Sequence, residues 1–324
     1  MAGMRFIVYG AGAIGGAIGG RLHQHGHDTV LIARGRHLDA LREGGLELRS
    51  PEETTIIKVP VVDDPERIGL RADDVVVLAM KTQDTAGALA RLAAVAPPEI
   101  AVVCAQNGVE NERLALRCFA QVYGMYVVLP ATHLEPGVVQ ASSTPVTGIL
   151  DMGRYPSGVD DMAADVAATL EASTFSARSD GTIMRWKYAK LLTNLANALE
   201  AICGPEARRS DLVEEVQAEG RACLAAAGID VASADEARDR AGDLVRLRPV
   251  AGARRQGGSS WQSLARQAGS IETDWLNGEI VLLGRLHGIP TPLNVLLQRV
   301  ANRMAAEGAA PGSMTVGQLR AQLA

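Results

Sequence analysis

The feature that most constrains the fold is a glycine-rich run near the start of the chain, Gly10-Ala11-Gly12-Ala13-Ile14-Gly15. The run directly follows the strand-like stretch RFIVY and opens a Gly/Ala-rich helical pattern. In that context glycines allow a tight turn, close approach of the backbone to a pyrophosphate, and close packing of helix on strand. The order of strand, glycine turn, helix and second strand predicts a dinucleotide site. A glycine-rich turn in an unrelated α/β protein is the weaker alternative.

Short β-branched runs alternate with helical patterns through the first half of the 324-residue chain. This order is typical of a parallel sheet with crossover helices. From about residue 184 nearly all of the sequence has helical periodicity. We therefore predict an α/β protein with a Rossmann-type dinucleotide-binding domain over residues 1–180 and an all-helical substrate and catalytic domain over residues 181–324.

Two segments qualify this outline. After about residue 120, strand-like runs joined by Pro/Gly turns predict the far edge of the sheet, with LEPG as a tight turn between antiparallel strands. In the second half, LRPVAGARRQGGSSW predicts a long loop between helices, of a length that is more often functional or mobile than idle.

Composition limits the partners. A net charge of -5 and the absence of a Lys/Arg-rich run give no attraction for nucleic acid or anionic lipid. No apolar run approaches the roughly 20 residues of a membrane span, and we expect a cytoplasmic protein. The sequence does not determine the oligomeric state, and a homodimer is compatible with it. The cysteines have no CxxC spacing, which predicts neither a metal site nor a disulfide: Cys104, Cys118, Cys203 and Cys223.

The second predicted strand ends at Ile32-Ala33-Arg34, where a site that prefers NAD usually carries Asp or Glu. Arginine suits the 2′-phosphate of NADPH, so Arg34 is the candidate and Arg36 a weaker one, with a plain surface residue as the alternative. Lys81 and Asn107 stand at the carboxyl ends of the third and fourth predicted strands, where such sheets bind ligands. Asn107 also reads as an ordinary turn residue before a glycine.

A polar stripe crosses the leucine-rich segment KYAKLLTNLANALEA. On a helix, Asn194 and Asn197 lie within about 40° of Lys190, and Lys187 lies near the same face one turn earlier. Amides on a mostly apolar helix need a polar partner, so the stripe predicts a ligand site. A partly solvated face at a domain junction is the alternative. The chain contains four lysines among 32 basic residues, which favours a specific role for each lysine.

A second group of polar residues follows the Gly/Arg/Ser-rich loop. Ser259 and Ser260 precede Trp261, and Glu272 falls at the start of a predicted helix, where a carboxylate is stabilised by the helix dipole. Taken alone, Glu272 reads most simply as an N-terminal helix residue.

Further motifs occur in a set order: Lys81-Thr82, Gln106-Asn107-Gly108, Lys190-Leu191-Leu192-Thr193-Asn194, Ser259-Ser260, Ile271-Glu272-Thr273-Asp274, Leu276-Asn277-Gly278 and His287-Gly288-Ile289-Pro290. Together with the glycine-rich run, this set resembles the ketopantoate reductase (2-dehydropantoate 2-reductase) family over nearly the whole chain. The resemblance implies a Rossmann domain, a helical domain and NADPH in the cleft between them. It also implies reduction of the 2-oxo acid ketopantoate to pantoate, a step of pantothenate biosynthesis.

The resemblance assigns roles to individual residues. Lys190 matches the catalytic lysine, and hydride arrival at a ketone requires such a proton donor. Asn194 and Ser260 match substrate ligands, and Glu272 matches the acid near lysine, substrate and cofactor. Lys81 and Asn107 match positions beside the nicotinamide, from where Asn107 would also reach the substrate.

The sequence departs from the family pattern at two places. Ala198 stands where a second asparagine is usual, with Asn197 as a substitute substrate ligand one position earlier, and Gln262 and Ser263 stand where an acid is common. These changes put the substrate in doubt more than the reaction. Alternatives are a reductase of another 2-oxo acid or ketone, and a non-catalytic dinucleotide sensor. Retention of Lys190 and Glu272 argues against the sensor.

Overall fold

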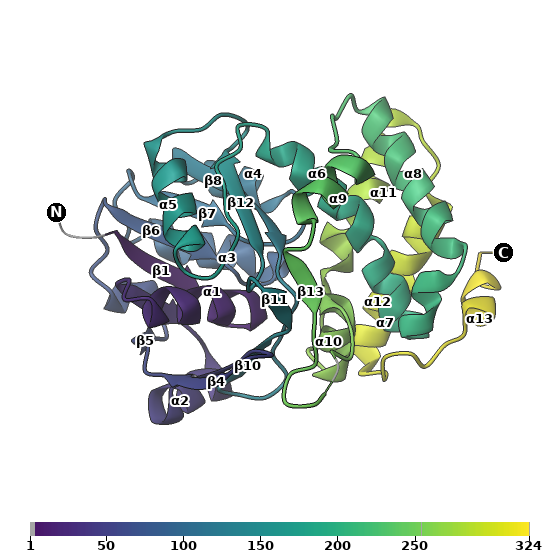
Figure 1. Cartoon of the computed structure of the whole chain (residues 1–324). Helices are drawn as coiled ribbons and strands as arrows, with labels where there is room; N and C mark the ends of the chain where they lie inside the picture. The colour runs from purple at the N-terminus through teal and green to yellow at the C-terminus, as the bar shows by residue number, and fades with distance from the viewer. Residues whose placement is uncertain (1–3, 254, 324) are drawn as a thin grey trace. The chain divides into compact units, whose positions relative to one another are not determined.

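The computed structural model describes residues 4–253 and 255–323. The chain divides into two compact units (Figure 1): Met1–Lys187 with Asp235–Arg255, and Tyr188–Ala234 with Gln256–Ala324. The division lies within helix α6 (Ile183–Asn194), a few residues beyond the boundary predicted at residue 180. The second difference is larger, because Asp235–Arg255 returns to the first unit although the sequence pattern assigned it to the helical domain.

The first unit is built on a seven-stranded sheet with strand order β12-β8-β7-β6-β1-β2-β5. Neighbouring strands are parallel except for β12, which is antiparallel to β8, and this confirms the predicted parallel sheet. The strand order reverses beside β1, and ligands bind at the carboxyl ends of such sheets at that point. The strands are β1 (Arg5–Tyr9), β2 (Thr29–Ile32), β5 (Val61–Val62), β6 (Asp74–Leu78), β7 (Ala101–Cys104), β8 (Gln121–Val128) and β12 (Ile149–Arg154).

Both faces of this sheet are buried, as a parallel sheet requires. Alternate residues of β1 enter two different cores, with Phe6 and Val8 on one face and Ile7 and Tyr9 on the other. Helices α1 (Ala13–Gln24) and α5 (Asp161–Glu171) cover the first face. The second face is covered by α3 (Thr82–Ala93) and α4 (Asn111–Leu116).

A smaller sheet with strand order β4-β3-β10-β9 also belongs to the first unit. Of the strands predicted at the far edge of the main sheet, only β8 and β12 lie there. The prediction was wrong for β9 and β10, which belong to the smaller sheet. The predicted LEPG turn is confirmed, since it joins the antiparallel strands β9 and β10, and Gly137 has a φ of +81°. The elements are α2 (Gly35–Gly44), β3 (Leu46–Arg49), β4 (Thr54–Ile57), η1 (Pro65–Arg67), β9 (Ala131–Thr132) and β10 (Val138–Ala141).

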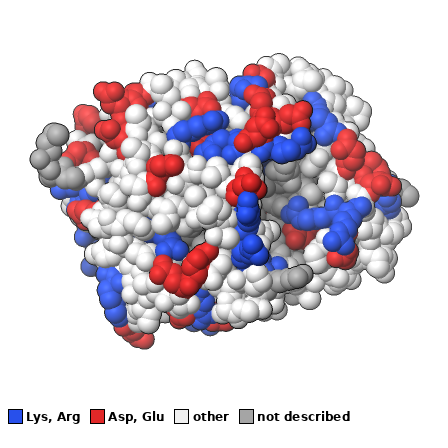
Figure 2. Space-filling view, viewed as in Figure 1, with Lys and Arg blue, Asp and Glu red and all other residues white. Residues whose placement is uncertain are grey.

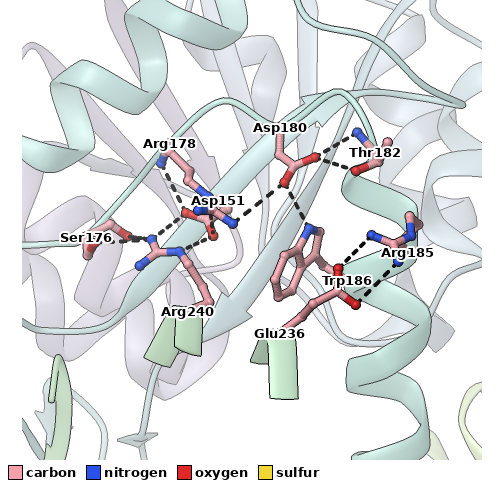
Figure 3. A network of polar contacts seen from close by, with 9 residues as sticks. All are labelled: Asp151, Ser176, Arg178, Asp180, Thr182, Arg185, Trp186, Glu236 and Arg240. Carbon is pink, nitrogen blue, oxygen red and sulfur yellow. Dashed lines mark hydrogen bonds and ion pairs between the residues drawn. The ribbon is translucent and has the colours of Figure 1, made fainter. Parts of the chain in front are cut away.

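The returning segment is fixed to the first unit by a strand and a buried ion pair. Strand β13 (Val245–Leu247) pairs antiparallel with β11 (Ser143–Pro145), immediately before the run predicted as a loop, which begins at Leu247. In helix α9 (Ala234–Ala241), Arg240 binds both carboxylate oxygens of Asp151 at 2.6 Å, and Asp151 is fully buried (Figure 3). An unpaired charge in such a place would be strongly destabilising, so Arg240 fastens α9 to β12.

A second part of the same network fixes the start of α6. Asp180 accepts hydrogen bonds from the backbone and hydroxyl of Thr182 and, at 2.9 Å, from the indole of Trp186 (Figure 3). Arg185 forms an ion pair with Glu236 of α9 at 3.1 Å. The first turns of α6 are therefore held by side chains of the first unit.

The second unit is helical, as predicted, and packs closely where small residues allow it. A Cβ at Gly220 in α8 would lie 2.7 Å from a methyl group of Leu192 and 2.9 Å from one of Leu195. Its elements, after α6, are α7 (Ala196–Cys203), η2 (Pro205–Arg209), α8 (Leu212–Ala226), α10 (Ser259–Ala265), η3 (Glu272–Trp275), α11 (Asn277–His287), α12 (Pro292–Glu307) and α13 (Val316–Arg320).

Two surface observations bear on partners. Basic and acidic side chains are interspersed on the face shown in Figure 2, with many uncharged residues between them. Among the described residues, none of the helices combines the length and the apolar character that a membrane crossing demands.

Candidate active site

The glycine-rich turn has the geometry that a dinucleotide site needs. Gly10 has a φ of +103°, and a Cβ there would lie 2.7 Å from the backbone nitrogen of Met80. A Cβ at Gly15 would lie 2.0 Å from the Gly10 carbonyl oxygen, which fixes the close packing of α1 on the turn. At Gly12, by contrast, a Cβ would meet no atom within 4 Å. Two glycines are thus required by packing, and the third leaves room for a ligand to approach.

The N-terminus of α1 adds an electrostatic reason for an anion to bind here. Gly12 is its N-cap, no side chain caps the first turn, and no acidic residue lies in that turn. Uncapped amide groups at a helix N-terminus are a site for phosphate. Ala11 is buried, whereas Ala13 and Ile14 are partly buried, so the start of the helix remains accessible. The residues present fit a dinucleotide pyrophosphate.

Arg34 is the N-cap residue of α2, directly after β2, as predicted. Its guanidinium lies 3.3 Å from a carboxylate oxygen of Asp84 in α3, and both side chains are about half exposed. An exposed pair of this kind contributes little stability, so Arg34 can exchange Asp84 for a phosphate at small cost. Arg36 is exposed in the first turn of the same helix.

Lys81 and Asn107 follow β6 and β7, as predicted, and a buried polar network holds these strand ends together. The Gln106 amide donates to the Met80 carbonyl and to the Thr85 hydroxyl, and Thr85 in turn donates to Asn111. The Asn111 amide donates to the backbone carbonyl of Asn107 at 3.2 Å. This network fixes the turn that carries Asn107. Lys81 is the partly buried N-cap residue of α3.

Lys187 was predicted to lie near the asparagine stripe, but the structure places it elsewhere. It is 3% exposed and lies inside the first unit, 2.6 Å from a carboxylate oxygen of Glu112 in α4. Its ammonium also donates to the carbonyls of Gln106 at 2.9 Å, Met125 at 3.3 Å and Cys104 at 3.4 Å. Burial raises the pKa of Glu112, and the charge of Lys187 opposes that shift. With four oxygen partners, Lys187 is a structural residue.

Lys190 and Asn194 lie beyond the division, in the second unit. Lys190 is partly buried, and Asn194, about one turn later on α6, is 5% exposed. The side-chain nitrogen of Asn194 is buried and has no hydrogen-bond partner among the described residues. An unsatisfied buried donor of this kind costs about 1–3 kcal/mol, which a bound acceptor would recover.

Asn197 lies in α7, 7% exposed, with its amide oxygen already occupied. Arg208 of η2 donates to that oxygen at 2.5 Å and pairs with Glu200 at 2.7 Å. Arg208 thus fixes the orientation of the Asn197 amide. Asn197 and Glu200 share one face of α7, and Ala198, at the family's asparagine position, is buried.

Ser260 is brought close to α7 by the residue two positions before it. The Gly258 amide donates to Glu200 at 3.2 Å, and a Cβ at Gly258 would lie 2.7 Å from the same oxygen. Gly258 is the N-cap of α10, in which Ser260 is 2% exposed. Glu200 thus anchors the helix that carries Ser260. Gln262 and Ser263, at the positions where an acid is common, are also buried.

Glu272 is the first residue of the four-residue 3-10 helix η3 and is 4% exposed. Its neighbour Thr273 is 1% exposed, and the Thr273 hydroxyl has no hydrogen-bond partner among the described residues. The start of α11 is bound to the junction of α6 and α7, because the Asn277 amide donates to the Leu195 carbonyl at 3.2 Å. Leu195 is the single residue between α6 and α7. Glu272 is thus deeply buried, and the helix that it begins is too short to have more than a small dipole.

Sequence reasoning missed Asn111, Glu200 and Arg208, which support the candidate site residues, and Asp84 and Glu112, the partners of Arg34 and Lys187. These contacts join segments far apart in the chain, and no local pattern signals them. Among residues 4–253 and 255–323, no group of three or more His, Cys, Asp or Glu side chains could hold a metal ion.

The first unit has a parallel sheet with an open glycine turn at a helix N-terminus, and the second unit has a lysine and an unsatisfied amide. This combination is typical of a dinucleotide-dependent oxidoreductase. Comparison with known families narrows that class. Residues 6–156 match the family model described as ketopantoate reductase PanE/ApbA, and residues 182–305 match the model of its C-terminal part. The chain belongs to the ketopantoate reductase family.

Relatives and solved structures agree with this membership. The chain is 26% identical to the 2-dehydropantoate 2-reductase of Pyrococcus horikoshii, over 91% of this chain and 95% of the relative. It is 29% identical to that of Archaeoglobus fulgidus, with coverages of 90% and 94%. A PanE/ApbA family ketopantoate reductase from Ralstonia eutropha JMP134 superposes with a TM-score of 0.77 at 27% identity, over 94% and 99% of the two chains. D-mandelate dehydrogenase with NADH and anilino(oxo)acetate shares the fold, with a TM-score of 0.78 at 21% identity and the same coverages.

Proposed function

We propose that this chain reduces 2-dehydropantoate to pantoate with NADPH, in the cytoplasm, as a step of pantothenate biosynthesis. The observation that carries the proposal is the buried, unsatisfied amide of Asn194, one helical turn beyond Lys190. The relatives from Pyrococcus horikoshii and Archaeoglobus fulgidus, which match over nine tenths of this chain, are named for that reaction.

The first unit supports NADPH as the cofactor. Gly12 and the uncapped start of α1 would hold the pyrophosphate, and Arg34 would meet the 2′-phosphate in place of Asp84. Lys81 and Asn107 would flank the nicotinamide from the ends of β6 and β7, where the Gln106 network fixes the turn. When bound, NADPH supplies the hydride that reaches the ketone carbon.

The second unit supplies the groups for the proton and the substrate. As charge develops on the carbonyl oxygen, the Lys190 ammonium donates a proton to it, so that no free alkoxide forms. Asn194 donates from its unsatisfied nitrogen to an oxygen of the 2-oxo acid, and Ser260 contributes its hydroxyl. Glu272, a buried acid at the start of η3, would orient Lys190 and the substrate. Held groups of this kind can lower a barrier by several kcal/mol through positioning.

A second candidate, reduction of a different 2-oxo acid, is favoured by a specific observation. Ala198 replaces the usual asparagine, and the substitute Asn197 is bound at its oxygen by Arg208. The substrate would then find the Asn197 amide oxygen already engaged, next to the Arg208–Glu200 pair. A substrate with a different group at that position would fit the arrangement equally well.

A panel of 2-oxo acids tests the proposal, with NADPH oxidation as the readout and purified chain at equal concentration throughout. Ketopantoate should have the highest kcat/KM of the panel. A clear preference for another 2-oxo acid would favour the second candidate. Tight NADPH binding without turnover of any member would contradict reductase function altogether. Analytical ultracentrifugation of the same sample distinguishes a monomer from a homodimer.

A further inference from the structure

His37 in α2 connects two segments of the first unit that are remote in sequence. The backbone amide of Gly137 donates to its Nδ1 at 2.9 Å, and its Nε2 lies 2.8 Å from the carbonyl oxygen of Ala11. Ala11 belongs to the glycine-rich turn, and Gly137 to the LEPG turn between β9 and β10. The ring thus lies between the dinucleotide turn and a neighbouring hairpin.

These two contacts fix the tautomer of His37. A backbone amide can only donate, so Nδ1 must accept, and a carbonyl can only accept, so Nε2 must carry the hydrogen. His133 packs against the same ring, with centroids 4.2 Å apart and an interplanar angle of 50°. Because the Nδ1 of His133 lies 2.9 Å from the Val138 carbonyl, that nitrogen carries its hydrogen. The His37 ring is held at both nitrogens and over one face.

The position of His37 gives these contacts a consequence for the cofactor. The backbone amides of the glycine turn bind β2, because Gly10 and Ala11 both donate to the Ile32 carbonyl, at 3.0 and 3.2 Å. The Ala11 carbonyl of the same turn binds α2 through His37. Arg34 is the N-cap of that same helix, one turn before His37. The ring therefore sets the distance between the pyrophosphate turn and the arginine.

We propose that His37 is a positioning residue for the dinucleotide, which holds the glycine turn and Arg34 in register so that pyrophosphate and 2′-phosphate are bound together. The inference rests on the proposed NADPH site. It distinguishes His37 from a residue that merely stabilises the fold, because its effect depends on the ligand. NADPH uses both anchors, whereas NADH lacks the 2′-phosphate and uses only the glycine turn.

Two substitutions separate the two contacts of the ring. His37→Gln places an amide nitrogen near the position of Nε2, so it can keep the donor to Ala11 and loses the acceptor for Gly137. His37→Asn places its amide near Nδ1, so it can keep the Gly137 contact and loses the donor to Ala11. Asp39→Ala, at an exposed position of the same helix, is the matched control.

Fluorescence titration of NADPH and NADH, without substrate, is the binding measurement. His37→Asn should weaken NADPH binding by about tenfold, the upper range for one lost hydrogen bond, and NADH binding by less than about threefold. His37→Gln should retain more of the NADPH affinity than His37→Asn, and Asp39→Ala should match the parent. In the Arg34→Ala background, His37→Asn should cost little further NADPH affinity, because one anchor is already lost.

Several results would overturn the inference. One is equal loss of NADPH and NADH affinity together with a lower melting temperature, which would make His37 a fold residue only. Another is unchanged NADPH binding by His37→Asn. ¹⁵N NMR of the imidazole provides a readout independent of binding, and a hydrogen on Nδ1 of His37 would contradict the assigned tautomer. A parent chain that bound neither dinucleotide would overturn the proposed function and this inference together, whereas NADPH binding that the variants leave intact overturns the inference alone.

Discussion

Lys187 and Lys190 lie three residues apart on α6, yet Lys187 is enclosed by oxygen partners, whereas one turn beyond Lys190 lies a buried amide donor without a partner in the described part of the chain. In the first unit, Lys187 is enclosed by a carboxylate and three carbonyls, all within 3.4 Å. In the second unit, Lys190 is only partly buried, and the next polar residue on its face, Asn194, has an unsatisfied amide. A buried ammonium with several oxygen partners indicates a structural residue, whereas a buried amide donor without a partner is a candidate for contact with a ligand.

The largest effect that tests this comparison is on stability. Lys187→Met should lower the free energy of unfolding by about 3–5 kcal/mol, because it leaves Glu112 as an unpaired charge in the core. Urea unfolding of parent and variant measures the difference. The matched control is Lys187→Met with Glu112→Leu, which removes both charges and should recover most of the loss. A single variant within about 1 kcal/mol of the parent would contradict the structural role.

The second test uses Asn194, where the opposite result is expected. Asn194→Leu should raise KM for the 2-oxo acid by about tenfold or more, because one donor to the substrate is lost. Its melting temperature should stay level or rise, since the unsatisfied amide is replaced by an apolar side chain of similar size. Kinetics together with calorimetry decide the matter. Lower stability with unchanged KM would place Asn194 with Lys187 rather than with the ligand site.

A third test concerns Arg34, an exposed residue of the first unit that is weakly paired with Asp84. The parent should prefer NADPH to NADH by at least about tenfold in kcat/KM, equivalent to about 1.4 kcal/mol, and Arg34→Ala should remove most of that preference. Steady-state assays with each cofactor measure it. Asp84→Asn is the matched control, because it releases Arg34 and should leave the preference in place. Equal use of both cofactors by the parent would contradict the assignment.

The smallest effect is a pH dependence of the Lys187→Met deficit. Burial raises the pKa of Glu112, and removal of Lys187 takes away the charge that opposes this shift. A carboxyl group whose folded pKa is raised binds more protons in the folded state, so stability falls as pH rises through that pKa. The deficit should therefore shrink as pH is lowered toward the ordinary glutamate value of about 4.3. Urea unfolding across that range measures it, and a deficit that grew on acidification would contradict the pairing.

The parts of the site that depend on local geometry were predictable from the sequence. Gly10, Gly12 and Gly15 follow from the demands of one turn, and Arg34 follows from its place at the end of β2. Helix periodicity was sufficient to place Asn194 about one turn beyond Lys190 on α6, but not to show that Asn197 lies in the separate helix α7. Likewise, the alternation of strand and helix patterns was sufficient to predict the parallel sheet.

The remaining features depend on contacts between distant segments. Spacing alone placed Lys187 on nearly the same face as Lys190, and only the position of Glu112 in α4 shows that it has a different role. The contact between His37 and Gly137 joins residues 100 positions apart. The return of α9 and β13 to the first unit depends on Arg240 reaching the buried Asp151, and a helical or loop-like sequence pattern carries no sign of that partner.

The central claim is that Lys190 donates the proton while Lys187 supports the fold. Single-turnover NADPH oxidation with saturating ketopantoate tests it most directly, on Lys190→Ala beside the Lys187→Met and Glu112→Leu double variant. Lys190→Ala should lose about 10² to 10⁴ in rate, the usual contribution of a positioned acid, with NADPH affinity and melting temperature unchanged. The double variant should keep a rate within about tenfold of the parent. Near-parental turnover by Lys190→Ala, or a collapse of turnover in a stably folded double variant, would contradict the account.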